Sequence, residues 1–265
     1  MTKRELLCDY AIFYHGNWSK IAEAITTNAT VPHFACDHTI TIYDDIYPKA
    51  FRYLRFPPWV LFYKGNIDLL NKRCISIVGS RNASEYGINC TRKIVQSLSK
   101  RYVIVSGLAK GIDSIAHNEA LRNDTPTIGF IGSGLNTMYP SSNKDLYYQM
   151  YDRGLVLSEY PDHVGVRKEH FPWRNRLIAA MGEKVIVTEA SKKSGTMLTV
   201  NEAINLSKDV YVVPYPLTKN NDSGCNLLLS QGAFLLYDWG QLEYLWNKNV
   251  ANLQCFYYSI ECLRS

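Results

Sequence analysis

The chain has 265 residues, 46% of them hydrophobic and 20% charged, which is the length of one large domain or two small ones. This composition argues against a disordered chain, a collagen-like repeat and a coiled coil. No apolar run approaches the ~18–20 residues that span a bilayer, and the N-terminus lacks the apolar stretch of a signal peptide, so we expect a cytoplasmic protein without membrane contact. The formal net charge of +5 is too small to identify a partner.

The N-terminal part of the chain carries a helical pattern. Trp18, Ile21 and Ile25 recur at spacings of three and four, and Pro32 follows the pattern. We therefore predict a short helical region over residues 1–38. The next segment is rich in aromatic residues and proline, and it contains an extended run at 60–63.

Six short runs rich in Val and Ile follow, and most are separated by the length of one helix and two turns. They cover residues 74–78, 102–105, 127–131, 155–157, 184–188 and 210–213. Strands this apolar are typical of parallel strands that helices cover on both faces. The sequence thus predicts an α/β fold, a Rossmann-like, doubly wound, mostly parallel sheet with a small helical N-terminal region. Ligands of such sheets bind at the carboxyl ends of the strands, where the strand order reverses.

The residues after the first three of these runs favour an anionic ligand. Gly79, Gly107 and Gly132 each begin a turn there, and a glycine turn lets a phosphate approach the backbone. Arg81 and Lys110 lie in the same turns and carry positive charge. We predict that the three turns converge on one crevice for a phosphate- or nucleotide-shaped ligand.

Motifs for cofactors and metals are absent. No G-x-G-x-x-G follows a strand and no G-x-x-x-x-G-K-[ST] occurs, which argues against a dinucleotide cofactor and against NTP hydrolysis. The seven cysteines are scattered without C-x-x-C spacing, so we expect reduced thiols and no metal site. Asp113 and His117, one turn apart on a predicted helix, are expected to hydrogen-bond to each other rather than to bind a metal.

Positive charge is concentrated in one part of the chain. Residues 72–110 hold eight basic residues and one acidic residue, a surplus of seven that exceeds the surplus of five for the whole chain. A second basic cluster is interleaved with aromatic residues and consists of Arg167, Lys168, His170, Phe171, Trp173, Arg174 and Arg176. Cations beside aromatic rings suit a single-stranded nucleic acid, because its phosphates need positive charge and its unpaired bases stack.

An ordered series of short motifs extends from about residue 40 to residue 237. It includes Ile77-Val78-Gly79-Ser80-Arg81, Ser106-Gly107-Leu108-Ala109-Lys110-Gly111-Ile112-Asp113, Gly132-Ser133-Gly134, Tyr139-Pro140, Ser158-Glu159-Tyr160-Pro161, Phe171-Pro172-Trp173-Arg174-Asn175-Arg176, Ser194-Gly195-Thr196 and Gly224-Cys225-Asn226. This series closely resembles the DNA-processing protein A family, which is also called the Smf family.

The resemblance implies a Rossmann-like protein that binds single-stranded DNA, protects incoming DNA and helps to load a RecA-type recombinase onto it during natural transformation. It also implies a homodimer, no catalytic activity and no cofactor. The DNA-binding residues that it implies are Gly79, Ser80, Arg81, Gly107, Lys110, Gly132, Asn143, Lys144, Arg174, Asn175, Arg176, Ser194, Gly195 and Thr196. Lys110 stands where the family often has arginine, which keeps the charge but loses bidentate geometry.

The resemblance also sets the expected domain boundaries. We expect the short helical region at 1–38, a Rossmann-like DNA-binding domain at 39–240 and a C-terminal tail at 241–265. About 28 residues follow Tyr237, which is too few for the winged-helix domain of many relatives, so we expect no winged helix.

Two other classes of function fit part of the pattern. The Ser194-Gly195-Thr196 turn is similar to that of nucleoside-monophosphate phosphoribohydrolases, but Thr199 stands where their catalytic glutamate is expected. Glu159 and Glu189 both follow predicted strands and could form a carboxylate pair, although Glu189 is rather expected to cap a turn or to bind a nearby lysine. The other alternative is a small-nucleotide sensor, which would saturate with one nucleotide, whereas a DNA binder gains affinity with oligonucleotide length.

Overall fold

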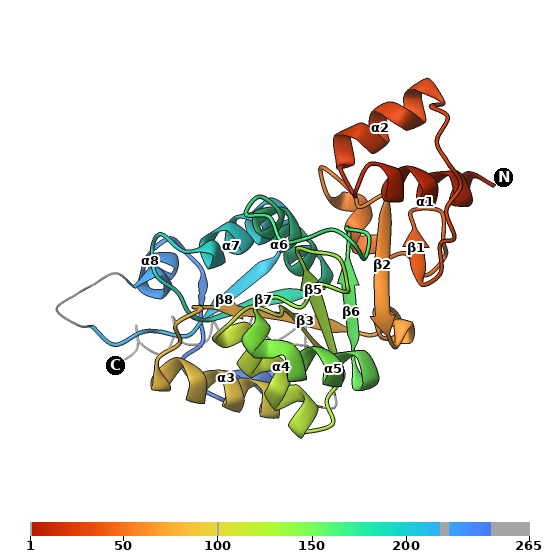
Figure 1. Ribbon diagram of the computed structural model, residues 1–265. Coiled ribbons are helices and arrows are strands. Elements are labelled where there is room, and N and C mark those ends of the chain that lie inside the picture. The colour runs from red at the N-terminus through yellow and green to blue at the C-terminus, as the bar shows by residue number, and fades with distance from the viewer. Residues whose placement is uncertain (1, 100, 218–222, 245–265) are drawn as a thin grey trace, which may run out of the picture.

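A mixed sheet of nine strands runs through the computed structural model, which describes residues 2–99, 101–217 and 223–244 (Figure 1). The strand order is β1-β2-β6-β5-β4-β3-β7-β8-β9. The strands from β6 to β9 in this order are parallel, and β2 and β1 extend one edge of the sheet in antiparallel pairing. Their bounds are β1 Thr39–Thr41, β2 Val60–Gly65, β3 Cys74–Gly79, β4 Val103–Gly107, β5 Thr127–Ile131, β6 Leu155–Ser158, β7 Lys184–Glu189, β8 Asp209–Val212 and β9 Phe234–Leu235.

Helices cover both faces of this sheet (Figure 1). On one face lie α3 (Glu85–Leu98), α4 (Ile112–Arg122) and α5 (Lys144–Arg153), and on the other lie α6 (His170–Met181), α7 (Gly195–Asn205) and α8 (Gly224–Ser230). Short 3₁₀ helices occur at η1 (Lys49–Tyr53), η2 (Ile67–Asn71) and η3 (Ser141–Asn143). This arrangement confirms the predicted doubly wound α/β fold, and each of the six Val- and Ile-rich runs forms a parallel strand.

Alternate side chains of the central strand β3 belong to two separate hydrophobic cores. In β3, Ile75 and Ile77 pack with the helices α3 and α4, whereas Cys74 and Val78 pack with α6 and α7. All four side chains are buried. A strand that is covered on both faces must be apolar at successive positions, which is why these strands stand out in the sequence.

Two helices form the N-terminal region and lie beside the antiparallel edge of the sheet (Figure 1). The spacing of apolar residues correctly predicts α2 (Trp18–Thr27), but it gives no signal for α1 (Lys3–Phe13). In α1 the buried residues are consecutive, from Leu7 to Ala11, because α2, β1 and β2 all pack against this helix. A helix that is covered on several sides lacks the spaced apolar stripe of a surface helix.

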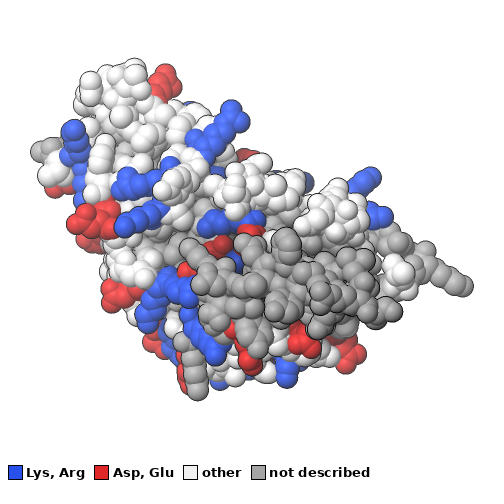
Figure 2. Space-filling view, turned by 180° about the vertical axis from the view of Figure 1, so that it is seen from behind, with Lys and Arg blue, Asp and Glu red and all other residues white. Residues whose placement is uncertain are grey.

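The predicted C-terminal tail at 241–265 lies outside the described residues except for the short helix α9 (Gln241–Tyr244). Among the described helices, none has both the length and the apolar character that a membrane span requires. Viewed from behind, the described surface shows Lys and Arg together with Asp and Glu (Figure 2). Charge alone therefore does not mark a binding surface on that side.

Candidate functional site

The turns after β3, β4 and β5 surround a pocket at the carboxyl ends of these strands, called the rim pocket below. Its volume is about 140 Å³, below the ~300–1,000 Å³ of sites that enclose a drug-sized ligand. The side chains and turns that line it are Arg81, Leu108, Ala109, Lys110, Phe130, Ile131, Gly132, Ser133, Tyr139, Pro140, Tyr147, Phe171 and Arg174. A pocket of this size can hold one chemical group, such as a phosphate or the edge of a base, but not a whole nucleotide.

The rim pocket lies beside the point where the strand order reverses, not at that point. The order reverses between β3 and β7, and there the Ser80 amide donates to the Glu189 carbonyl at 2.7 Å. The Glu189 carboxylate accepts hydrogen bonds from the Ser84 amide at 3.0 Å and from the Ser84 hydroxyl at 2.7 Å. Glu189 thus caps the turn before α3, as expected. Its hydrogen bonds lie at the strand ends where ligands bind in other doubly wound sheets.

Two exposed cations and an aromatic ring lie at the mouth of the rim pocket. Arg81 and Lys110 are both exposed and come from the turns after β3 and β4. The guanidinium carbon of Arg81 is 5.4 Å from the centre of the Phe171 ring, which is a cation–π distance. The mouth therefore offers positive charge and an aromatic surface next to each other.

Arg174 lies at the base of the rim pocket and is only 5% exposed. Its Nη1 donates to the Phe130 carbonyl at 2.7 Å, and its Nε has no hydrogen-bond partner among the described residues. Burial lowers the pKa of Arg174, and the charge of Asp113 opposes this effect. Burial likewise raises the pKa of Asp113 against the charge of Arg174. Because these two buried charges compensate each other, the positive charge offered to a ligand comes from Arg81 and Lys110.

At each of the three predicted glycine turns, other atoms of the protein occupy the space that a side chain would need. A Cβ on Gly107 would overlap Nη1 of Arg174, and a Cβ on Gly79 would overlap the side chain of Ile112. A Cβ on Gly132 would press against the first residue of α6 at 3.3 Å. We expected these glycines to admit a phosphate to the backbone. The structure gives each of them an internal packing reason, and the approach of a phosphate stays a prediction.

Three further predicted residues border the rim pocket without lining it. The Asn143 amide donates to the two carbonyls that follow β4, at 3.0 and 3.2 Å, and so ties η3 to that turn. The Ser80 hydroxyl accepts a hydrogen bond from the Asn82 amide at 3.1 Å within its own turn. Lys144 is exposed at the start of α5.

The remaining predicted residues do not line the rim pocket. Arg176 is 4% exposed and donates two hydrogen bonds to the Glu159 carboxylate, at 2.6 and 2.7 Å. The Asn175 amide donates at 3.2 Å to the middle carbonyl of the Ser194-Gly195-Thr196 turn, which links α6 to the start of α7. The structure therefore joins Asn175 to the Ser194-Gly195-Thr196 turn and Arg176 to Glu159, and none of these residues lines the pocket with Arg81 and Lys110.

His117 does not bond to Asp113, so that prediction is wrong. Its Nδ1 lies 2.7 Å from the Thr127 hydroxyl on β5, and its Nε2 has no hydrogen-bond partner among the described residues. Burial, aided by the charge of Arg174, lowers the pKa of His117 to about 3, so the ring is neutral at neutral pH. The bonding partner lies on a strand of the neighbouring βα unit, and the helical spacing of Asp113 and His117 carries no information about it.

The second basic cluster is divided between the rim pocket and a separate groove. Phe171 and Arg174 line the rim pocket, whereas Arg167, His170 and Trp173 line a groove of about 460 Å³ against the turn between α1 and α2. The first turn of α6 separates the two hollows. Residues that are neighbours in the sequence face different hollows because successive side chains of a helix point in different directions.

The predicted DNA-binding residues do not include the two tyrosines of the rim pocket. Tyr139 and Tyr147 line it, and the Tyr147 hydroxyl donates to the Tyr139 carbonyl at 2.9 Å. The Tyr139 ring is centred 5.6 Å from the ring of Phe171. The available signal was the Tyr139-Pro140 motif, which belongs to the series shared with the DNA-processing protein A family.

Comparisons with known sequences identify the family of the chain. A sequence model of the family described as DNA recombination-mediator protein A matches residues 38–246. The chain is 42% identical to DNA processing protein DprA of Streptococcus pneumoniae over 198 residues, which cover 75% of this chain and 70% of that protein. It is 38% identical to Protein Smf of Synechocystis over 204 residues, which cover 75% of this chain and 51% of that relative.

Two solved structures share the fold. The X-ray structure of DprA from S. pneumoniae is 40% identical, with a TM-score of 0.75 over 78% of this chain and 73% of that chain. DprA from Helicobacter pylori, whose structure is described as giving insight into a unique single-stranded DNA binding mode, is 33% identical. Its TM-score is 0.71 over 78% of this chain and 95% of that chain. The chain belongs to the DNA recombination-mediator protein A family, which confirms the resemblance.

The substitution Gly107→Ala is expected to displace Arg174, because the added methyl group occupies the position of its guanidinium. We expect the free energy of unfolding to fall by about 1–3 kcal/mol, the range for an overpacked buried site. Gly195→Ala is the matched control, since no described atom lies within 4 Å of its Cβ position. Urea unfolding measures both variants, and an equal effect of the two would contradict the packing role of Gly107.

Two Arg–Glu pairs with bidentate geometry among the described residues allow a second test. Glu159→Gln leaves the buried charge of Arg176 without its counter-charge, and we expect a loss of about 3–5 kcal/mol in the free energy of unfolding. The control is Glu183→Gln, which breaks the pair with Arg73, whose side chains are 53% and 41% exposed. An exposed pair contributes about 0–1 kcal/mol. Urea unfolding that shows similar losses for both variants would refute the structural role of the Glu159 pair.

Proposed function

We propose that the chain binds single-stranded DNA across the rim pocket and acts, without catalytic activity, as a recombination mediator. The observation that carries this proposal is the pairing of two exposed cations, Arg81 and Lys110, with the ring of Phe171 at one mouth. Cations contact phosphates and aromatic rings stack on unpaired bases, and both contacts tolerate any base sequence. The single-stranded DNA binding described for the H. pylori relative supports the same ligand.

The proposed cellular role follows from membership in the family. The chain would protect incoming DNA in the cytoplasm and help to load a RecA-type recombinase onto it during natural transformation. A homodimer would present two rim pockets to one strand and so raise the avidity for long DNA.

The structure suggests how the predicted DNA-binding residues divide the task. Arg81 and Lys110 make the phosphate contacts, and the exposed Lys144 extends the basic surface along α5. Asn143 and Arg174 act indirectly, since Asn143 is bonded to the turn after β4 and Arg174 to the backbone of β5 near its end, and each holds its partner in place. We leave Arg176 out of the contact set because its guanidinium is buried on Glu159.

The contacts of the two rim carboxylates argue against the phosphoribohydrolase alternative. Glu159 is paired with Arg176 and Glu189 caps α3, so neither is available to stabilise a cationic sugar. Thr199, at the position of the catalytic glutamate, is 2% exposed. The small volume of the rim pocket argues against a sensor that encloses one nucleotide.

Charge reversal at the mouth tests the proposal. Arg81→Glu is expected to weaken the binding of a labelled single-stranded oligonucleotide by at least about tenfold, because one phosphate contact becomes repulsive. Arg122→Glu is the control, since it changes the net charge equally at a site that is 69% exposed in the last turn of α4. That site lies about 15 Å along the helix from the rim. Fluorescence anisotropy measures both, and equal losses would remove the rim pocket from the binding surface.

The same assay separates a DNA binder from a nucleotide sensor. Affinity should rise as the oligonucleotide lengthens by several bases and should fall steeply with salt, with Arg81→Glu reducing the salt slope by about 1. A duplex of the same sequence should bind more weakly, because its paired bases cannot stack on Phe171. Saturation by a single nucleotide with the affinity of an oligonucleotide would favour the sensor.

A further inference from the structure

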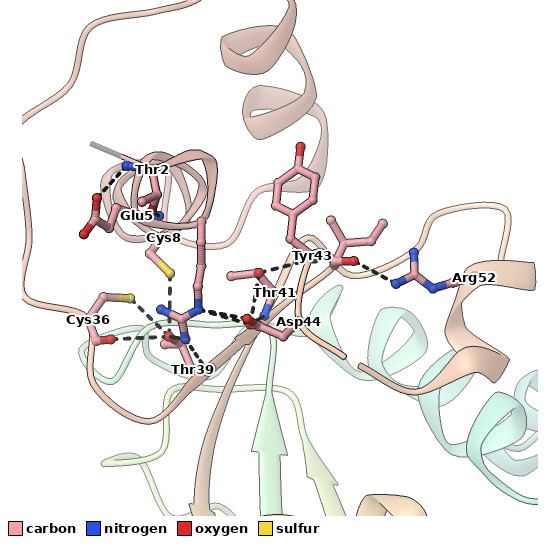
Figure 3. Close-up of polar contacts among 11 residues, drawn as sticks. Thr2, Glu5, Cys8, Cys36, Thr39, Thr41, Tyr43, Asp44 and Arg52 are labelled. Atoms are coloured by element: carbon pink, nitrogen blue, oxygen red, sulfur yellow. Dashed lines mark hydrogen bonds and ion pairs between the residues drawn. The ribbon is translucent and has the colours of Figure 1, made fainter. Parts of the chain in front are cut away.

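Two cysteine sulfurs of the N-terminal region converge on one hydroxyl group (Figure 3). The Sγ atoms of Cys8 and Cys36 each lie 3.6 Å from Oγ1 of Thr39. Cys8 belongs to α1 and Cys36 to the segment that leads into β1, so the two thiols meet only in the folded chain.

The hydroxyl between the sulfurs is held in a fixed position. Nη2 of Arg4 donates to the Thr39 carbonyl at 2.9 Å and to the Thr39 hydroxyl at 3.3 Å. Nε of the same guanidinium donates to the carboxylate of Asp44 at 3.0 and 3.2 Å. Thr39 is the first residue of β1, so the sheet fixes its backbone as well.

The segment that carries Cys36 is bound to α1 before it reaches that cysteine. The carboxylate of Asp9, which is fully buried, accepts a hydrogen bond from the Phe34 amide at 2.8 Å. The hydroxyl of Tyr10 donates to the Ala29 carbonyl at 2.8 Å. With β1 on its other side, Cys36 is held next to Cys8 from both directions along the chain.

The surroundings of Cys8 favour its thiolate, because this buried sulfur contacts the Thr39 hydroxyl, which also accepts a hydrogen bond from the Arg4 guanidinium. The neighbouring Cys36 thiol lowers the pKa of the Cys8 thiol, and the Thr39 hydroxyl and the charge of Arg4 act in the same direction against burial. The neighbouring Cys8 thiol and burial raise the pKa of Cys36. A thiolate, not a thiol, reacts with oxidants. Cys36 is partly exposed and opens the pair to solvent.

The other described cysteines lack this arrangement. Cys74, Cys90 and Cys225 are buried, and burial raises the pKa of each thiol. A thiol with a raised pKa in apolar surroundings is unreactive. The reactivity of these three thiols toward an oxidant can therefore serve as an internal reference for the reactivity of Cys8 and Cys36.

We propose that Cys8 and Cys36 are a site of oxidative modification, at which hydrogen peroxide converts the two thiols of the folded chain into an intramolecular disulfide. The Cys8 thiolate attacks one peroxide oxygen, the O–O bond breaks, and the departing hydroxide takes up a proton to form water. The Cys36 sulfur then attacks the Cys8 sulfur of the resulting sulfenic acid. The S–S bond forms as the S–O bond breaks, and a second water leaves with the Cys36 proton. Peroxide gains the two electrons that the thiols lose.

The disulfide would bind α1 covalently to the segment before β1. Both cysteines lie in the N-terminal region, and neither lines the rim pocket. The modification therefore goes beyond the proposed DNA binding and does not depend on it. It would secure the N-terminal region against local unfolding, since a crosslink removes open conformations of the chain.

Peptide mapping of the full chain tests the proposal. The protein is treated with hydrogen peroxide, the remaining thiols are alkylated in denaturant, and the chain is cut with trypsin. Cleavage after Arg4, Lys20 and Lys49 places Cys8 alone in peptide 5–20 and Cys36 alone in peptide 21–49. We expect these peptides to appear linked, with the loss of two hydrogens, at a yield about tenfold above any other pairing, because exchange depends on thiolate character and access.

Three controls make the result decisive. Cys8→Ser and Cys36→Ser should each abolish the linked peptide. Peroxide treatment of chains already unfolded in guanidinium should remove the preference for this pair, because only the fold brings the two sulfurs together. Mass spectra in which both peptides remain alkylated after peroxide, like the peptides of Cys74 and Cys90, would overturn the proposal. Links between chains, or further oxidation of Cys8 without the linked peptide, would overturn it as well.

Discussion

The arrangement of the rim pocket depends on the contacts of the buried Arg174 guanidinium. This guanidinium donates to the Phe130 carbonyl at the end of β5, faces Asp113 at the start of α4 and occupies the space left by Gly107 at the end of β4. This one side chain of α6 thereby positions the ends of β4 and β5. It also positions α4, which lies on the other face of the sheet. A buried charge that loses its partner costs about 3–5 kcal/mol, so this arrangement tolerates little movement.

The same constraint explains why the net charge of the chain says little about its ligand. The charge of Arg174 is matched by Asp113, and that of Arg176 is matched by Glu159, so both are part of the structure. Only cations that stay exposed at the rim can act on a ligand from outside. At the rim pocket these exposed cations are Arg81 and Lys110, and they carry its positive charge.

The first turn of α6 and the N-terminal region together define the surroundings of that mouth. The turn separates the rim pocket from the larger groove beside α1 and α2, and it places aromatic residues on both sides. The thiol pair lies within the N-terminal region, and neither of its cysteines lines the rim pocket. DNA binding and thiol oxidation would thus use different residues in different parts of the same chain.

The sequence by itself determined the parallel strands, because a strand covered on both faces must be apolar throughout, and it determined the family through contiguous motifs around Gly79, Gly107 and Gly132. Only the tertiary structure decided that Arg174, and not Arg176, reaches the rim pocket, because the sequence does not show that Arg174 bonds to Phe130 and Arg176 to Glu159. It also decided the partner of His117 and the position of Cys8 and Cys36 around the Thr39 hydroxyl. These contacts join residues far apart in the chain, and spacing within one helix or strand carries no information about them.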